Sequence, residues 1–262
     1  MEYKNDLVME AKGLTFSYDG RHNVIENLEL ALQQGKITVL MGANGCGKST
    51  LFKLMTRNLY PDDGDIMLAD RDIEMMGQKE FARNVAIVHQ NNTSPPDITV
   101  ETLVGYGRTP YLGTFQAAGS RQDREAVAWA MAVTHVEQHR SSYVSELSGG
   151  QRQRVWIAMA LAQKTDILFL DEPTTYLDIR YQIEIMKLIR DLNREYGITI
   201  VMVHHDINQA IEYGDVFVGM KDGRIVAQGN PEETIDTELL YELYGIRLPV
   251  VEVAGKRFVM TV

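Results

Sequence analysis

The most informative segment of this 262-residue chain is Gly42-Ala43-Asn44-Gly45-Cys46-Gly47-Lys48-Ser49. It fits the pattern G-x-x-x-x-G-K-[ST], whose glycines let the backbone curve around a phosphate group and direct N–H groups toward it. The lysine adds a compact positive charge for the β- and γ-phosphates, and the serine hydroxyl is a ligand for Mg²⁺. We call residues 42–49 the phosphate loop, and predict that it holds a nucleotide.

The residues on either side of the phosphate loop have the order that such a loop requires. Residues 37–41 are continuously apolar and rich in β-branched side chains, as expected of a strand buried on both faces. After the loop, Leu51, Leu54 and Met55 recur on one side of a helix. The N-terminus of that helix adds the positive end of its dipole to the phosphate site. The sequence therefore predicts a strand–loop–helix unit.

Further strand patterns alternate with helical patterns along the rest of the chain. The strands are expected at residues 167–170 and 198–203, and the helices at 152–163 and 182–196. This alternation predicts an α/β fold with a parallel sheet between flanking helices. An antiparallel pair is expected before the phosphate loop, at residues 7–17 and 24–32.

The middle of the chain reads as an α-helical insertion. No strong strand pattern occurs between Thr99 and Glu146, and residues 121–136 have a helical pattern with Ser120 as its N-cap. We therefore divide the single domain into a first core part (1–94), a helical subdomain (95–150) and a second core part (151–262). The last part is expected to contain a hairpin at 216–228, short helices at 231 and 237–244, and a final hairpin at 250–262.

Composition excludes several classes of protein. The chain has 26 Lys and Arg against 36 Asp and Glu, a net charge of −10, which argues against nucleic acid as a partner. The single cysteine, Cys46, permits no intrachain disulfide and favours a reducing compartment. Because no apolar run approaches the roughly 20 residues of a membrane span, we expect a cytoplasmic protein.

Two acidic residues follow the strand expected at 167–170. A strand that ends there delivers Asp171 to the carboxyl edge of the sheet, where its carboxylate can join the shell of a nucleotide-bound Mg²⁺. Glu172 can then orient or deprotonate a water for attack on the terminal phosphate. Exposed acidic turn residues would give the same pattern, and the upstream phosphate loop is what favours catalysis.

A second anion-binding feature occurs at Leu147-Ser148-Gly149-Gly150-Gln151. A serine followed by two glycines at the start of a helix offers another set of N–H donors to an anion. One nucleotide does not need two such sites on one chain. The simplest explanation is a dimer, in which this segment faces the nucleotide of the other subunit.

This last segment resembles the signature motif L-S-G-G-Q of the ATP-binding cassette (ABC) ATPases. Other family motifs follow in the expected order, and the resemblance covers essentially the whole chain. The matches are Tyr18 (adenine stacking), Gln90 (Q-loop), Asp171 (Walker B), Glu172 (catalytic glutamate), Tyr176-Leu177-Asp178 (D-loop) and His205 (switch histidine). His204 precedes the switch histidine, and we assign it to packing because neighbouring side chains of a strand point to opposite faces.

The resemblance implies ATP and Mg²⁺ as cofactors and a head-to-tail dimer as the working form. Each ATP would lie between the loop residues of one subunit, extended to Thr50, and Ser148, Gly149, Gly150 and Gln151 of the other. Lys48, Gln90, Glu172 and His205 would take part in hydrolysis. The metal would be held by Ser49, Gln90 and Asp171. Asp178 would link the two sites across the interface.

The resemblance also implies that the chain serves a transporter. A pump would need separate transmembrane permease subunits and, indirectly, a substrate-binding protein, with this chain on the inner face of the membrane. The permease contact is expected at residues 91–115, in or near which lie Phe81, Tyr106, Tyr111 and Phe115. The predicted function is therefore an ATP-hydrolysing subunit of an ABC importer.

Three segments indicate which subfamily of ABC ATPases the chain resembles. Residues 105–111, 177–182 and 239–245 are similar to ATPases that drive uptake of siderophores, haem or cobalamin. Ala43 and Tyr181 depart from the subfamily, many of whose members have proline and histidine there. A zinc or manganese importer ATPase and a non-transport ABC ATPase, such as one in iron–sulfur cluster assembly, remain alternatives.

Overall fold

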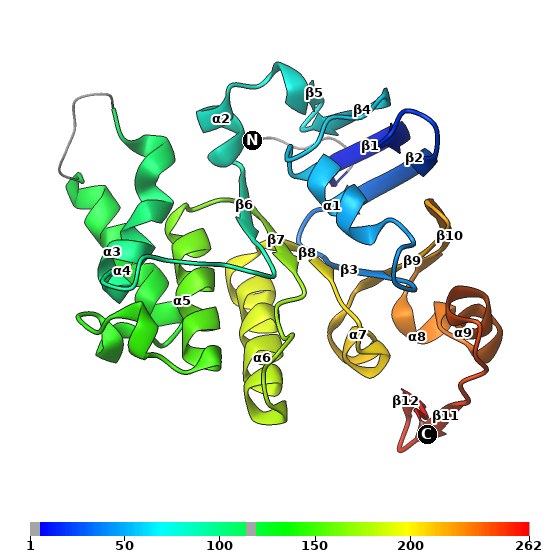
Figure 1. Cartoon of the computed structure of the whole chain (residues 1–262). Coiled ribbons are helices and arrows are strands. Elements are labelled where there is room, and N and C mark those ends of the chain that lie inside the picture. The colour runs from blue at the N-terminus through cyan, green and yellow to red at the C-terminus, as the bar shows by residue number, and fades with distance from the viewer. Residues whose placement is uncertain (1–5, 114–118, 262) are drawn as a thin grey trace. The chain divides into compact units, whose positions relative to one another are not determined.

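The computed structural model describes residues 6–113 and 119–261 of the chain. Contacts divide the chain into two compact units, one from Met1–Met76 with Thr199–Val262 and the other from Gly77–Ile198. We call them the loop unit, which contains the phosphate loop, and the helical unit. Figure 1 colours the loop unit blue to cyan and yellow to red, and the helical unit in the colours between.

The loop unit contains two sheets. The first has the strand order β2-β1-β4-β5, all antiparallel, and confirms the expected N-terminal pair through β1 and β2. In the second, β3 runs parallel to both β8 and β9, and β9 pairs antiparallel with β10. The strands are β1 (Leu7–Ser17), β2 (Asn23–Gln33), β3 (Ile37–Met41), β4 (Asp63–Leu68), β5 (Arg71–Asp72), β8 (Thr199–Val203), β9 (Val216–Lys221), β10 (Arg224–Gly229), β11 (Val250–Val253) and β12 (Lys256–Val259).

The helices of the loop unit are short and lie against these sheets. The central strands β3 and β8 are buried at every residue, which is why their sequences do not alternate. The helices are α1 (Lys48–Met55), η1 (Ile73–Met75), α7 (Ile207–Tyr213), α8 (Pro231–Thr234) and α9 (Thr237–Tyr244). Asn230 caps α8 by accepting the Glu232 N–H, and Gly245 ends α9 in the left-handed conformation, both as expected.

The helical unit packs a group of helices with the parallel strand pair β6–β7. Its strands are β6 (Val85–Val88) and β7 (Ile167–Asp171). Its helices are α2 (Gln78–Ala82), α3 (Val100–Gly105), η2 (Tyr106–Tyr111), α4 (Arg121–Val133), η3 (Glu137–His139), η4 (Val144–Glu146), α5 (Gly149–Ala162) and α6 (Ile179–Tyr196). The α/β class and the helical insertion are thus confirmed. No helix within the described ranges is long and apolar enough to cross a membrane.

One helix ends earlier than its pattern predicts. The capping box of Ser120 and Asp123 is present, but α4 stops at Val133, three residues before the predicted end at Val136. His135 takes a left-handed backbone conformation (φ 57°), and the N–H of Val136 donates to the carbonyl of Met131. This closing turn satisfies the last helical carbonyls, and apolar periodicity alone cannot locate it.

Candidate nucleotide-binding and hydrolysis site

The backbone of the phosphate loop needs glycine at three positions. Gly42, Gly45 and Gly47 have φ angles of 150°, 82° and 106°, where other residues are strained. A Cβ on Gly42 would lie 2.2 Å from the carbonyl oxygen of Met220, and one on Gly47 would lie 2.9 Å from Cδ1 of Ile25. Glycine therefore provides both the curvature of the loop and its close approach to neighbouring strands.

The ammonium group of Lys48 lies within the phosphate loop. Only 5% of the residue is exposed, and its Nζ donates to the carbonyl oxygens of Gly42 and Ala43 at 2.8 and 2.9 Å. Nζ also lies 3.8 Å from Sγ of Cys46. The loop thus folds around its own ammonium group, while Asn44, Gly45 and Ser49 are exposed on the same segment.

Tyr18 lies beside the helix that follows the phosphate loop. Its hydroxyl is 3.2 Å from Oγ1 of Thr50, in the first turn of α1. The ring packs edge-on against Phe16 and is nevertheless 60% exposed. An aromatic ring that is held by its neighbours and is still largely exposed is suited to stacking on a nucleobase.

The two histidines after β8 have the contrasting environments that we expected. His204 is 4% exposed, and its Nε2 lies 3.0 Å from Oε1 of Gln209. His205 is exposed, and Asp206 directly after it caps α7 by accepting the N–H of Gln209 at 2.9 Å. His204 is therefore a packing residue. The side chain of His205 is accessible to a ligand.

In the helical unit, the structure brings Gln90 and Glu172 together. Val88 of β6 pairs with Leu170 of β7 in a parallel ladder. Gln90 and Glu172 each lie two positions beyond this pair, so they leave the two strands at the same level. The amide of Gln90 donates to Oε2 of Glu172, which also accepts from Oγ1 of Thr175 at 2.9 Å. Glu172 adopts a left-handed backbone (φ 48°), a strained conformation that such contacts help to hold.

The signature segment forms the capped N-terminus of α5. Ser148 Oγ accepts the N–H of Gln151, and Gln151 Oε1 accepts the N–H of Ser148 at 2.9 Å. Gly150 also has a packing role that we did not foresee, because a Cβ there would lie 2.3 Å from the Tyr181 ring. Ser148 and Gly149 are exposed, so this helix end is open to a ligand or a partner.

The D-loop segment is exposed and partly apolar. Asp178 caps α6 by accepting the N–H of Tyr181 at 3.1 Å, which gives this carboxylate a role within the chain. Its neighbours Tyr176 and Ile179 are 87% and 75% exposed. Exposed apolar side chains that flank a capped helix end are typical of a protein contact surface.

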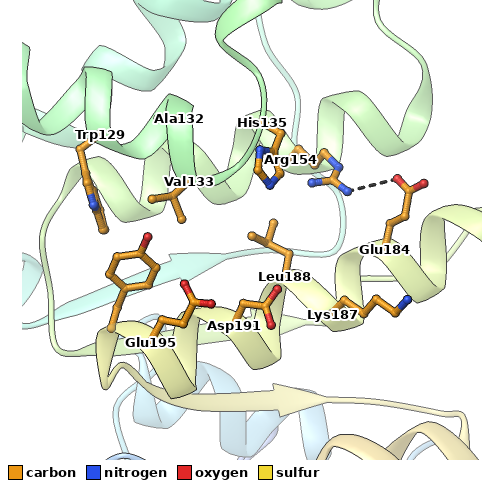
Figure 2. A pocket seen from close by; sticks show the side chains of 11 residues that line it. Trp129, Ala132, Val133, His135, Arg154, Glu184, Lys187, Leu188, Asp191 and Glu195 are labelled. Atoms are coloured by element: carbon orange, nitrogen blue, oxygen red, sulfur yellow. Dashed lines mark hydrogen bonds and ion pairs between the residues drawn. The ribbon is translucent and has the colours of Figure 1, made fainter.

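The helical unit also contains a cavity of about 640 Å³ between α4, α5 and α6 (Figure 2). Two of its charged side chains are paired with each other, because Arg154 lies 3.1 Å from Glu184, and the Trp129 ring that lines it also contacts Lys164. Hydrogen bonding from Arg180, and also from Arg154, holds the pKa of Glu184 below its ordinary value. The cavity has no glycine-rich segment, and we do not assign a nucleotide to it.

Cys46 allows a chemical test of the phosphate loop. The thiol is buried and its sulfur lies against Gly42, since it would be 2.8 Å from a Cβ built there, so a bulky adduct would disturb the loop. We expect N-ethylmaleimide to abolish ATP binding and saturating ATP to slow the modification. Mass spectrometry of the chain measures the adduct, with Cys46→Ser as the unreactive control. Equal labelling with and without ATP would contradict the assignment.

Comparisons with known proteins identify the family. The family profile described as ABC transporter matches residues 25–175. This chain belongs to the ABC transporter ATPases. The ferric enterobactin transport ATP-binding protein FepC of Escherichia coli (strain K12) is 43% identical over 254 residues, which cover 96% of this chain and 93% of FepC. The petrobactin import ATP-binding protein FpuD of Bacillus anthracis is 47% identical over 236 residues, which cover 90% of this chain and 86% of FpuD.

Solved structures of ABC proteins agree with this membership. A chain from a candidate metal-chelate ABC transporter in an inward-facing conformation has a TM-score of 0.83 and 26% identity, covering 97% of this chain and 96% of its own. The cassette MJ0796, solved as a dimer, has a TM-score of 0.73 and 28% identity, covering 85% of this chain and 98% of its own. As an ABC ATPase, the chain binds nucleotide and hydrolyses ATP.

Proposed function

We propose that this ABC ATPase powers the import of iron–siderophore complexes. The observation that carries the proposal is the identity of 40% or more, over most of the chain, to ATP-binding subunits whose names specify enterobactin, petrobactin and hydroxamate import. Other subunits of such a transporter contact the cargo. This sequence therefore indicates the cargo only through its similarity to relatives. Haem and cobalamin belong to the same predicted group of cargoes, and import of zinc or manganese is the alternative.

We propose that two copies enclose two ATP molecules. The exposed signature residues Ser148 and Gly149 support this, because the first turn of a helix presents backbone N–H groups to which a phosphate can bind. The exposed Tyr176 and Ile179 around Asp178 provide apolar surface that a second copy can cover. ATP would favour the closed dimer and hydrolysis would release it.

Within this dimer, Glu172 is the group that activates water, and Lys48 neutralises the terminal phosphates. Gln90 positions the Glu172 carboxylate through its amide. His205 contacts the γ-phosphate from the end of β8. Mg²⁺ would be held by Ser49, Gln90 and Asp171. Among the described residues no three His, Cys, Asp or Glu side chains gather as a metal site, which fits an ion bound mainly through phosphates.

The helical unit is the surface that we propose for a permease at the inner face of the membrane. Three of the aromatic residues in or near residues 91–115 have described positions. Tyr106 is 54% exposed, whereas Phe81 is buried and the Tyr111 hydroxyl donates to the carbonyl of Gln163. Tyr106 is therefore the aromatic residue best placed for a permease. Phe115 lies outside the described residues.

Uptake measurements test the cargo. Deletion of the gene should abolish uptake of at least one labelled ferric siderophore, and the wild-type gene should restore it. The variant Glu172→Gln should fail to restore uptake although the protein accumulates normally. Unchanged uptake of siderophores, haem and cobalamin after deletion would refute the proposed cargo and leave the ATPase assignment intact.

Co-purification tests the transport role itself. We expect affinity-tagged chain, extracted in mild detergent, to bring down a polytopic membrane protein. The variant Tyr106→Ala should reduce that recovery, and the core of the helical unit should be unaffected because Tyr106 is exposed. Recovery of soluble scaffold proteins in place of a membrane protein would favour the alternative role in iron–sulfur cluster assembly.

A further inference from the structure

The C-terminal hairpin of β11 and β12, drawn in red in Figure 1, depends on its neighbours for stability. Within the described part of the chain, its two strands pair only with each other. Ala254 and Gly255 form its turn with φ angles of 52° and 76°, as a tight two-residue hairpin requires. Because a two-stranded hairpin alone is only marginally stable in water, its contacts with neighbouring helices decide where it lies.

Asn208, in the first turn of α7, joins that helix to the hairpin by two hydrogen bonds. Its Nδ2 donates to the carbonyl oxygen of Val259 at 3.0 Å, and its Oδ1 accepts the N–H of Val259 at 2.7 Å. Val259 is the last residue of β12 and is only 3% exposed, so water would replace these bonds poorly. A side-chain amide carries both the donor and the acceptor that this double contact needs.

Two further contacts hold the hairpin against the loop unit. Lys256 Nζ lies 2.7 Å from Oε2 of Glu212, in the last turn of α7, and this ion pair is exposed. Arg257 donates from Nη1 to the carbonyl of Glu232 in α8. The hairpin is thus joined to both ends of α7 and also to α8.

His205, the predicted switch histidine, lies between two segments that are held in place. On one side, the N–H of His204 donates to the carbonyl of Leu40 in β3 at 3.2 Å, so the end of β8 is bonded to the sheet. On the other side, Asp206 caps α7 by accepting from Gln209, whose amide oxygen lies 3.0 Å from Nε2 of His204. The position of the His205 backbone is therefore set by the sheet and by α7.

We infer that the C-terminal hairpin positions the switch histidine, and that Asn208 is the positioning residue through which it acts. The buried side chains of Ile207 and Ile211 hold one face of α7. Asn208, three residues after His205, holds a second face through its two bonds to Val259. With the first turn of α7 held on both faces, His205 is kept ready to contact the γ-phosphate. The inference rests on the proposed role of His205 in hydrolysis.

The test is Asn208→Asp in the full-length chain, with Lys256→Ala as its matched control. The aspartate has nearly the same size, but it cannot donate to the carbonyl of Val259 and places an oxygen against it. The kcat for ATP hydrolysis should fall about 3–10-fold at an unchanged KM, because the phosphate loop is not altered. Lys256→Ala removes an ion pair of the same hairpin, but the lysine side chain is 58% exposed. This control should keep kcat within about twofold of wild type.

A double substitution separates positioning from general destabilisation. His205→Ala alone should lower kcat about 10²-fold or more. Adding Asn208→Asp should then cause no further loss, because the residue through which Asn208 acts is absent. A purely structural defect would lower kcat by the same factor in both backgrounds.

Hydrogen–deuterium exchange gives a readout that does not depend on hydrolysis. Exchange of residues 205–213, measured by mass spectrometry without nucleotide, reports how firmly α7 is held. Asn208→Asp should increase this exchange about 3–10-fold, and Lys256→Ala should leave it unchanged.

Three results would overturn the inference. The first is wild-type exchange or wild-type kcat for Asn208→Asp. The second is an equal fall in kcat for Lys256→Ala, which would indicate a general effect of the hairpin contacts. The third is the same fractional loss from Asn208→Asp with and without His205. Full turnover by His205→Ala would instead refute the proposed role of His205, on which the inference rests.

Discussion

Replacing Glu172 by glutamine is expected to lower ATP turnover about 10²–10⁴-fold while the protein still binds ATP. That loss corresponds to about 3–5 kcal/mol of transition-state stabilisation. The substitution keeps the size of the side chain and the hydrogen bonds that Gln90 and Thr175 donate to it. It removes the negative charge that accepts a proton from the attacking water, so the effect falls on kcat.

Binding and turnover must be measured separately for this prediction. Gel filtration of Glu172→Gln should show the mass of a dimer with ATP and of a monomer without it. Lys48→Ala should show no such shift because it loses the phosphate contacts. Glu125→Gln, an exposed glutamate on α4, should turn over ATP at the wild-type rate. Turnover of Glu172→Gln within tenfold of wild type would contradict the catalytic role, and an unchanged mass would contradict the closed dimer.

Much of the fold could be predicted because its strongest signals are local. The phosphate loop requires glycines of positive φ between a buried strand and a helix, and these features occupy adjacent positions in the sequence. The helix caps at Ser120, Ser148 and Asn230 are local for the same reason. In contrast, the sequence pattern does not predict β4 and β5, because half of residues 63–72 are charged and they become strands by pairing with each other and with distant β1.

In the candidate site, too, the residues with local sequence signals could be predicted, whereas their long-range contacts could not. Sequence patterns pointed to Gln90 and Glu172 separately, and only the register of β6 on β7 shows that they are in contact. The sequence pattern assigns Gly150 to anion binding alone, although the Tyr181 ring also excludes any side chain there.

The second large effect is expected at a buried ion pair in the helical unit. Arg108 donates from Nε to Oδ1 of Asp123 at 2.8 Å, and the two side chains are only 10% and 12% exposed. Arg108 also donates to the carbonyl of Ala162 at 2.8 Å, and Asp123 accepts from Ser120. The pair therefore connects η2, the start of α4 and the end of α5, the helix that begins at the signature residues.

Asp123→Ala should destabilise the chain by about 3–5 kcal/mol, because it leaves a buried guanidinium without its counter-charge. Urea denaturation followed by circular dichroism measures this. Glu125→Ala is the matched control, since its ion pair with Arg121 is exposed and should contribute less than about 1 kcal/mol. A loss below about 1 kcal/mol for Asp123→Ala would show that the pair does not hold these helices together.

The pH dependence of the same pair has a definite sign. Burial alone would raise the pKa of Asp123, but hydrogen bonds from Arg108 and Ser120 outweigh it and hold the pKa below its ordinary value. The pair therefore stabilises the fold fully above the pKa of an unfolded aspartate, about 4, and its contribution falls as the pH drops through the lower folded value. As the pH falls from 5 to below the folded pKa of Asp123, the free energy of unfolding should decrease more for wild type than for Asp123→Ala. Equal losses of stability in the two proteins would mean that folding does not lower the pKa of Asp123.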